Sequence, residues 1–246
     1  MHRNTIAFVI VAAIAGFIAG FWLANSINRS ALNSLNSQKT PATSANSASL
    51  PPNADSDLTA DELTSKIVEA DKNPTNFGYQ KDLGTALYRY AAMKQDKDLL
   101  TEAVRILERA SSTNAKDFEV LVALGNARFD IGFAKKDTSE YQKARDIYAK
   151  ALEIKPADAD VQTDLGLTYF LQEPAAYDKA AAELQRVSDS NPKHQRSLQF
   201  LVQVLVRQNK LADAEKALAK LKAIDPANSA VAELTSQISE AKSGVK

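Results

Sequence analysis

The sequence has no cysteine and only two histidines, His2 and His194, among its 246 residues. The absence of thiols excludes disulfide bonds, thiolate metal sites and a cysteine nucleophile. Two histidines leave almost no way to build a catalytic triad or a multi-histidine metal site. An enzyme would have to use carboxylates, lysine, serine or tyrosine alone. We therefore predict a protein with neither catalytic activity nor a cofactor.

Glycine, proline and net charge are scarce as well. Eight glycines and eight prolines are few for an all-β protein with many turns, and 30 basic residues balance 30 acidic ones. Without a net charge the chain has no overall field that would attract nucleic acid. Alanine, leucine, lysine, glutamate and glutamine are abundant instead, and this composition predicts an all-α fold.

One long uncharged stretch lies close to the N-terminus. Residues 6–24 form an unbroken apolar run of 19 residues. As a helix this run covers roughly 28 Å, close to the hydrocarbon thickness of a bilayer. It is longer than the apolar core of a typical signal peptide, and no clear cleavage site follows it. We therefore predict an uncleaved transmembrane helix at 5–24 after a short flank at 1–4.

The residues around and within this run predict how it lies in the membrane. Arg3 and the α-amino group precede it and Arg29 alone follows closely, which favours a cytoplasmic N-terminus and a body outside the cytoplasm. Small residues recur every four positions on one face of the predicted helix, at Ala12, Gly16, Gly20 and Ala24. This stripe is either a face for homodimerisation or a consequence of how common alanine and glycine are in such helices.

Residues 25–57 have the composition of a linker. Ser, Asn, Ala, Thr and Pro dominate this stretch, which contains no aromatic residue. It cannot bury enough apolar surface to fold, so we predict a disordered linker. Thr59 followed by Glu62 is the pattern of a capping box. A leading helix over about 60–70 is expected within 58–76, with Leu63, Ile67 and Val68 on one face.

The body of the chain repeats one pattern four times. Each unit opens on a leucine followed by glycine (valine in the fourth unit) and continues with two small or apolar residues seven positions apart. A proline follows five positions later, except in the first unit, where Ala115 replaces it. Each unit therefore reads as two helices and a stop, in which glycine and alanine let the helices approach closely. The predicted packing residues are Leu83, Gly84, Ala103, Ala110, Leu124, Gly125, Ala144, Ala151, Pro156, Leu165, Gly166, Ala180, Pro192, Leu201, Ala214 and Pro226.

This pattern resembles the tetratricopeptide repeat (TPR), over about residues 77–228. The resemblance implies an α-solenoid of about four helical hairpins, at 77–117, 118–158, 159–194 and 195–228, with a capping helix and tail at 229–246. The first leucine and the first small residue lie 20 positions apart in units one and two, but 15 and 13 apart in units three and four. Units one and two should therefore have longer helices, whose tips protrude on one edge.

In such a solenoid the first helix of each unit lines a concave groove. The resemblance implies that partner proteins or peptides contact this groove through Lys81, Thr85, Tyr88, Arg89, Val122, Asn126, Phe129, Asp130, Thr163, Leu167, Phe170, Leu171, Gln199, Gln203, Val206 and Arg207. Its middle is apolar and aromatic, which suits a peptide with a few apolar anchors. The competing interpretation is that Phe129, Phe170 and Leu171 only complete the core.

The remaining polar clusters have structural interpretations. Asp158, Asp160 and Asp164 lie at the start of a predicted helix, where caps and the helix dipole favour acids. His194 follows Pro192 in a turn between units, where we expect it to be exposed and without a role.

Together these features resemble bacterial envelope proteins with one N-terminal membrane span and a periplasmic repeat domain. The resemblance implies a non-enzymatic scaffold in envelope protein assembly, for example cytochrome c maturation or outer-membrane or pilus biogenesis. An oligomerising membrane organiser that acts through the membrane helix and the hairpin tips is the alternative.

Overall fold

The computed structural model describes residues 59–244. The predicted transmembrane helix at 5–24, its small-residue stripe and the linker at 25–57 lie outside these residues. Within 59–244, no helix combines the length and the apolar character needed to cross a bilayer.

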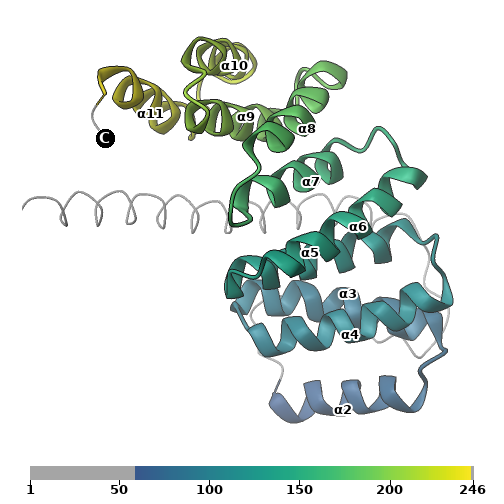
Figure 1. Cartoon of the computed structure of the whole chain (residues 1–246). Coiled ribbons are helices and arrows are strands. Elements are labelled where there is room, and N and C mark those ends of the chain that lie inside the picture. Colours follow the sequence, from purple (N-terminus) through teal and green to yellow (C-terminus); the bar gives the residue numbers. More distant parts are fainter. Residues whose placement is uncertain (1–58, 245–246) are drawn as a thin grey trace, which may run out of the picture.

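The described residues are all-α, with ten helices arranged as a leading helix, four antiparallel hairpins and a final helix (Figure 1). The helices are α2 (Ala60–Lys72), α3 (Phe77–Lys94), α4 (Lys97–Thr113), α5 (Phe118–Lys135), α6 (Thr138–Ile154), α7 (Ala159–Leu171), α8 (Tyr177–Ser190), α9 (Gln195–Arg207), α10 (Leu211–Ile224) and α11 (Val231–Ser243). We call α3, α5, α7 and α9 the first helices of the four units, and α4, α6, α8 and α10 the second helices.

Side-chain caps start many of these helices. The capping box predicted at Thr59 and Glu62 is present at the start of α2. Asp117 accepts a hydrogen bond from the backbone N–H of Val120, and Asp158 accepts one from Val161, at 3.0 Å in each case. Each cap satisfies a backbone donor that has no partner inside the helix.

Two glycines show why the repeat needs a residue without a side chain. A Cβ atom on Gly125 of α5 would lie 2.6 Å from the ring of Tyr148 on α6, and one on Gly84 of α3 would lie 2.8 Å from Leu107 on α4. Real Cβ atoms do not approach other atoms so closely. The hairpin helices therefore meet at these points only because glycine stands there.

The core consists of two clusters that share one helix. The first joins α2 to α5, and the second runs from α5 to α11. Helix α5 contributes Leu124 to the first cluster and Leu121 to the second, and Ile147 of α6 packs against both. Because α5 is buried on opposite sides, the hairpins form one continuous stack.

The helices differ in length along the stack, as the repeat spacing predicts. Helices α3 to α6 have 17 or 18 residues, whereas α7 to α10 have 13 or 14. The longer loop after α7 reaches back to the preceding hairpin, where the hydroxyl of Thr138 donates to the carbonyl of Glu173 (3.1 Å) and accepts from its N–H (3.2 Å).

Two local expectations are wrong. Val68 does not share the buried face of α2 with Leu63, since 44% of its surface is exposed. His194 is half-buried rather than idle: its Nδ1 accepts from the N–H of Ser197 at 3.3 Å and caps α9. Its Nε2 lies 3.2 Å from a carboxylate oxygen of Asp160.

Candidate functional site

The first helices form the inner face of a curved stack. Successive first helices contact one another, α3 with α5, α5 with α7 and α7 with α9. Successive second helices of the described units have no comparable contact. The first helices are therefore closer together, and the stack curves with their solvent side on the inside (Figure 1).

The predicted groove residues divide into a buried set and an accessible set. Six are nearly or fully buried, with exposed fractions of 0 to 7%: Tyr88, Asn126, Phe129, Asp130, Thr163 and Leu167. As placed, these side chains leave almost no surface for a partner, so the prediction that a partner contacts them directly needs correction. The rest of the set is half-buried or exposed.

The buried set has partners inside the protein. The hydroxyl of Tyr88 donates to Asp130 across α3 and α5 (3.2 Å), and that of Tyr148 donates to the side-chain oxygen of Asn126 (2.8 Å). The ring of Phe129 packs edge-on against that of Tyr141, 5.5 Å between centroids. The alternative weighed for Phe129, that it completes the core, therefore holds in this structure.

Four apolar side chains of the predicted set remain half-buried on three successive first helices. They are Val122 of α5, Phe170 and Leu171 of α7, and Val206 of α9, which we call the inner patch. The ring of Phe170 lies 6.0 Å from that of Tyr177 at the start of α8. Sequence reasoning missed Tyr177 because it begins a second helix and is not part of the repeat pattern.

Polar side chains on the first helices form links between units. Lys81 of α3 binds Asp117 (2.8 Å) and Glu119 (2.7 Å) at the start of α5. Burial alone would lower the pKa of Lys81, but these two hydrogen bonds raise it overall. Arg196 of α9 is likewise paired with Asp164 of α7. Lys81 is therefore less available to a partner than the predicted groove implied, and Arg196, which was not in the predicted set, is neutralised in the same way.

Four other polar members of the set differ in how accessible they are. Arg89 and Arg207 are exposed near the C-terminal ends of α3 and α9. Thr85 and Gln203 stand two positions after the leading leucine of their units, and the Oγ1 of Thr85 and Nε2 of Gln203 are buried without a hydrogen-bond partner among the described residues. These two atoms have almost no exposed surface, so a partner at the inner face does not reach them in this arrangement.

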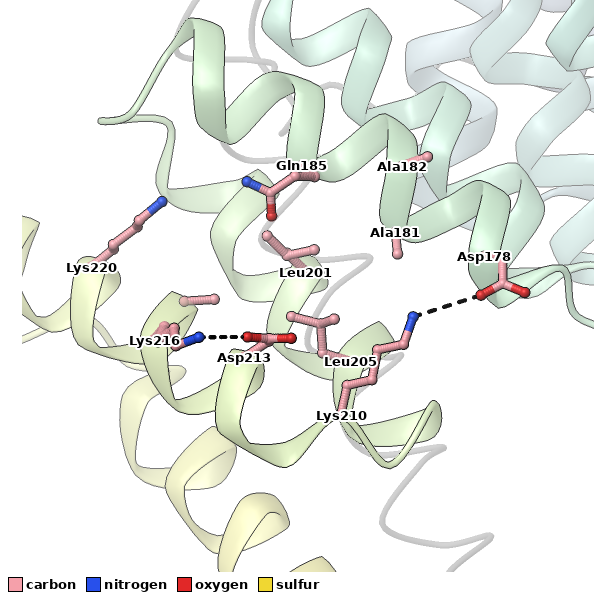
Figure 2. A pocket seen from close by; sticks show the side chains of 11 residues that line it. Asp178, Ala181, Ala182, Gln185, Leu201, Leu205, Lys210, Asp213, Lys216 and Lys220 are labelled. Carbon is pink, nitrogen blue, oxygen red and sulfur yellow. Dashed lines mark hydrogen bonds and ion pairs between the residues drawn. The ribbon is translucent and has the colours of Figure 1, made fainter.

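A hollow that sequence reasoning missed lies on the outer side of the stack, away from the inner patch. It is a groove of about 460 Å³ between α8 and α10, with Leu201 and Leu205 of α9 among the residues that line it (Figure 2). The sequence carries a signal for it in the three consecutive alanines 180–182, which leave little side-chain volume on α8.

Comparisons with known proteins agree with this fold. Residues 171–238 match the model of the tetratricopeptide repeat, and no curated protein sequence matches the chain. A crystal structure of MamA protein is 21% identical, covers 67% of this chain and 81% of its own, and has a TM-score of 0.54.

Two further solved structures are similar. YrrB, described as a TPR protein with an unusual peptide-binding site, is 14% identical over 72% of this chain and 82% of its own, with a TM-score of 0.54. TTC0263, a thermophilic TPR protein of Thermus thermophilus, is 18% identical over 73% of this chain and 88% of its own, with a TM-score of 0.51. At these identities the likeness shows the fold alone, which is the α-solenoid of TPR proteins.

Proposed function

We propose that the protein is a non-enzymatic scaffold that binds a peptide segment of a partner protein across its inner face. The observation that carries the proposal is the inner patch, where four half-buried apolar side chains follow one another over α5, α7 and α9. Apolar side chains that remain partly open on a rigid surface suit the anchor residues of a bound peptide. YrrB, which shares the fold, is itself described as having a peptide-binding site.

The apolar and basic side chains of the inner face indicate which kind of peptide would bind there. An apolar or aromatic anchor would remove the remaining surface of Val122, Phe170 and Val206 from water, which is favourable at about 25 cal/mol per Å². Arg89 and Arg207 are exposed toward the two ends of the face, where they can bind carboxylates of the partner. The preferred ligand is therefore an extended or helical segment with central apolar anchors and acidic flanks.

The proposed setting is the bacterial cell envelope. The apolar run at 6–24 and the linker at 25–57 support a single-pass anchor in the inner membrane, with the N-terminus cytoplasmic and the repeat domain periplasmic. A tethered scaffold of this kind would collect partners during envelope protein assembly, such as cytochrome c maturation or outer-membrane or pilus biogenesis.

Partner binding is tested by adding charge to the inner patch. Phe170→Glu combined with Val122→Glu should abolish co-purification of specific partners from detergent-solubilised membranes. Phe129 is unsuitable for this purpose, because it is only 3% exposed and a charge there would destabilise the fold. Ile154→Glu is the matched control, because Ile154 is an exposed apolar residue at the end of a second helix.

The double variant must keep its helical circular dichroism and melting temperature for the comparison to count. If a folded double variant still captures the same partners as the control, the inner face is not the binding site. Crosslinking that depends on residues 1–57 would then favour the oligomerising organiser.

The proposed topology can be tested by labelling an introduced cysteine, because the chain has no cysteine of its own. A single Ser243→Cys or His2→Cys substitution creates the only thiol in the chain. A membrane-impermeant maleimide that reaches the periplasm should label Ser243→Cys in intact cells, and label His2→Cys only after the inner membrane is opened. The reverse pattern would contradict the orientation, and release of the protein by salt washing would contradict the anchor.

A further inference from the structure

Three equivalent grooves separate successive second helices on the outer side of the stack. Two positions of the repeat determine how much space each groove has. The first directly follows the first small residue of a second helix, as Ala181 follows Ala180. The second lies four positions after the leading leucine of the next unit, as Leu205 does after Leu201. These pairs are Val104 and Arg128, Arg145 and Tyr169, and Ala181 and Leu205.

Long side chains occupy the first two grooves. Arg128 of α5 spans the groove between α4 and α6, since it is paired with Glu108 on one side and with Glu140 (2.7 Å) on the other. In the groove between α6 and α8, the guanidinium of Arg145 lies 4.6 Å from the ring centre of Tyr169, and Lys179 approaches the same ring at 5.5 Å. In both cases side chains of the protein itself occupy the space between the second helices.

The third groove is hollow. Between α8 and α10 the controlling residues are Ala181 and Leu205, and a volume of about 460 Å³ remains (Figure 2). The apolar part of its lining consists of Ala181, Ala182, Leu201, Leu205 and Ala217. The volume lies in the range of sites that hold ligands, about 300–1,000 Å³. We call this hollow the outer groove.

The rim of the outer groove is basic, and one of its cations has no acidic partner. Lys216 is paired with Asp213 at 2.8 Å and Lys210 with Asp178 at 3.8 Å, as the dashed lines in Figure 2 show. Both aspartates of the rim are thus matched by a lysine. Lys220 is the third lysine of the lining, and no acidic group within residues 59–244 pairs with it.

We propose that the outer groove is a second binding site, which takes an acidic amphipathic peptide segment of a partner protein. An apolar side chain of the segment would lie over Leu201 and Leu205 and occupy the space that Arg128 and Arg145 occupy in the other grooves. A carboxylate next to it would bind Lys220. The apolar floor disfavours a fully charged ligand such as phosphate, and the excess of lysine over aspartate disfavours a basic segment.

The outer groove is independent of the inner patch. The two sites share helix α9 but no residue: Leu201 and Leu205 line the outer groove together with α8 and α10, whereas Val206 belongs to the inner patch with residues of α5 and α7. A scaffold with both sites could hold two partners at once. The two proposals can therefore fail separately.

The test uses full-length protein in detergent and a fluorescent peptide of twelve residues, with leucine and glutamate at helical spacing. Fluorescence anisotropy should show saturable binding that weakens as salt increases. Lys220→Glu should weaken binding at least tenfold because it reverses the unpaired charge. Ala181→Leu should weaken it similarly because the new side chain fills the groove.

Two controls make the result specific. Lys222→Glu makes the same charge change on the same helix, outside the groove lining, and should leave the affinity within twofold of wild type. Phe170→Glu, which tests the inner patch, should also leave it unchanged. A peptide with glutamine in place of glutamate should lose at least tenfold in affinity.

The proposal is overturned if the peptide does not bind at millimolar protein concentration, or if Lys222→Glu weakens binding as much as Lys220→Glu. Binding of dodecanoate without binding of the peptide would overturn the assignment to a peptide and indicate a site for anionic amphiphiles. Ala181→Leu protects against a folding artefact, because it fills space and should melt no lower than wild type.

Discussion

The first two units and the last two units share the same repeat, but the groove between their second helices is filled in the first pair and hollow in the last. Units one and two have helices of 17 or 18 residues, and Arg128 joins three of those helices through Glu108 and Glu140. Units three and four have helices of 13 or 14 residues, and the groove between their second helices has Ala181 and Leu205 at its two controlling positions. The repeat thus determines how the backbone stacks, while single side chains determine whether the outer surface is closed or open.

The largest effect on stability should come from disturbing the close contact between α5 and α6, the two long helices of unit two. Gly125→Ala places a methyl group 2.6 Å from the ring of Tyr148, which is fully buried and hydrogen-bonded to Asn126. Overpacking should cost about 1–3 kcal/mol, more than the roughly 1 kcal/mol gained from helix propensity.

The equivalent glycine of unit three, Gly166 between the shorter helices α7 and α8, is the matched comparison. A Cβ on Gly166 would lie 3.1 Å from Leu184, so Gly166→Ala should change stability by less than about 1 kcal/mol. Denaturant unfolding measures both variants. Equal losses at the two positions would show that the two hairpins do not differ in how tightly they pack.

The next largest effect on stability should come from removing the ion pairs that cross the first groove. Arg128→Met keeps most of the side-chain volume but removes both ion pairs, and the side chain of Glu140 is only 12% exposed. Loss of such a partly buried pair should cost about 1–2 kcal/mol. Arg105→Met breaks a more exposed pair with Asp71 and should cost less than about 1 kcal/mol. Thermal melting that ranks them in the opposite order would contradict a special role for Arg128.

Acid should weaken the first half of the stack before the second. Two hydrogen bonds, from Arg105 first and then Arg109, lower the pKa of Asp71. Burial alone would raise the pKa of Asp117, but Lys81 lowers it overall. Because the pKa is lower in the folded state, each carboxylate contributes stability above its ordinary pKa, near 4, and the contribution disappears as the pH falls through the lowered value.

Hydrogen exchange at pH 3 and pH 7 measures this difference by region. Protection factors of α3 to α5 should fall more than those of α9 to α11, where the only lowered carboxyl pKa among the described residues is that of the exposed Asp213. A uniform fall along the stack would show that these pairs do not control acid stability.

The smallest effect should come from filling the outer groove. Ala181→Leu adds apolar volume beside Leu205 and should stabilise the fold by no more than about 1 kcal/mol. A loss of melting temperature by several degrees would show that the hollow is smaller than the structure indicates.

The sequence by itself determined the repeat architecture of the described residues. Leucine, glycine and alanine at fixed spacing specify where two helices touch, and the capping box at Thr59 and the acid at Asp158 specify where helices begin. The seven extra residues in units one and two amount to nearly two helical turns, so their effect on helix length is also local. Local patterns of this kind depend on the period of the helix and need no knowledge of distant contacts.

Only the tertiary structure decided which residues of the inner face remain accessible. Phe129 and Phe170 occupy the same register in neighbouring units, yet Phe129 is 3% exposed against Tyr141 while Phe170 is half-buried on the inner patch. The burial of each ring depends on which side chains of neighbouring helices pack against it. Because the helices differ in length, these neighbouring side chains differ between units. The three consecutive alanines of α8 only hint at the outer groove, because the hollow exists through the way α8, α9 and α10 pack and place their small side chains together.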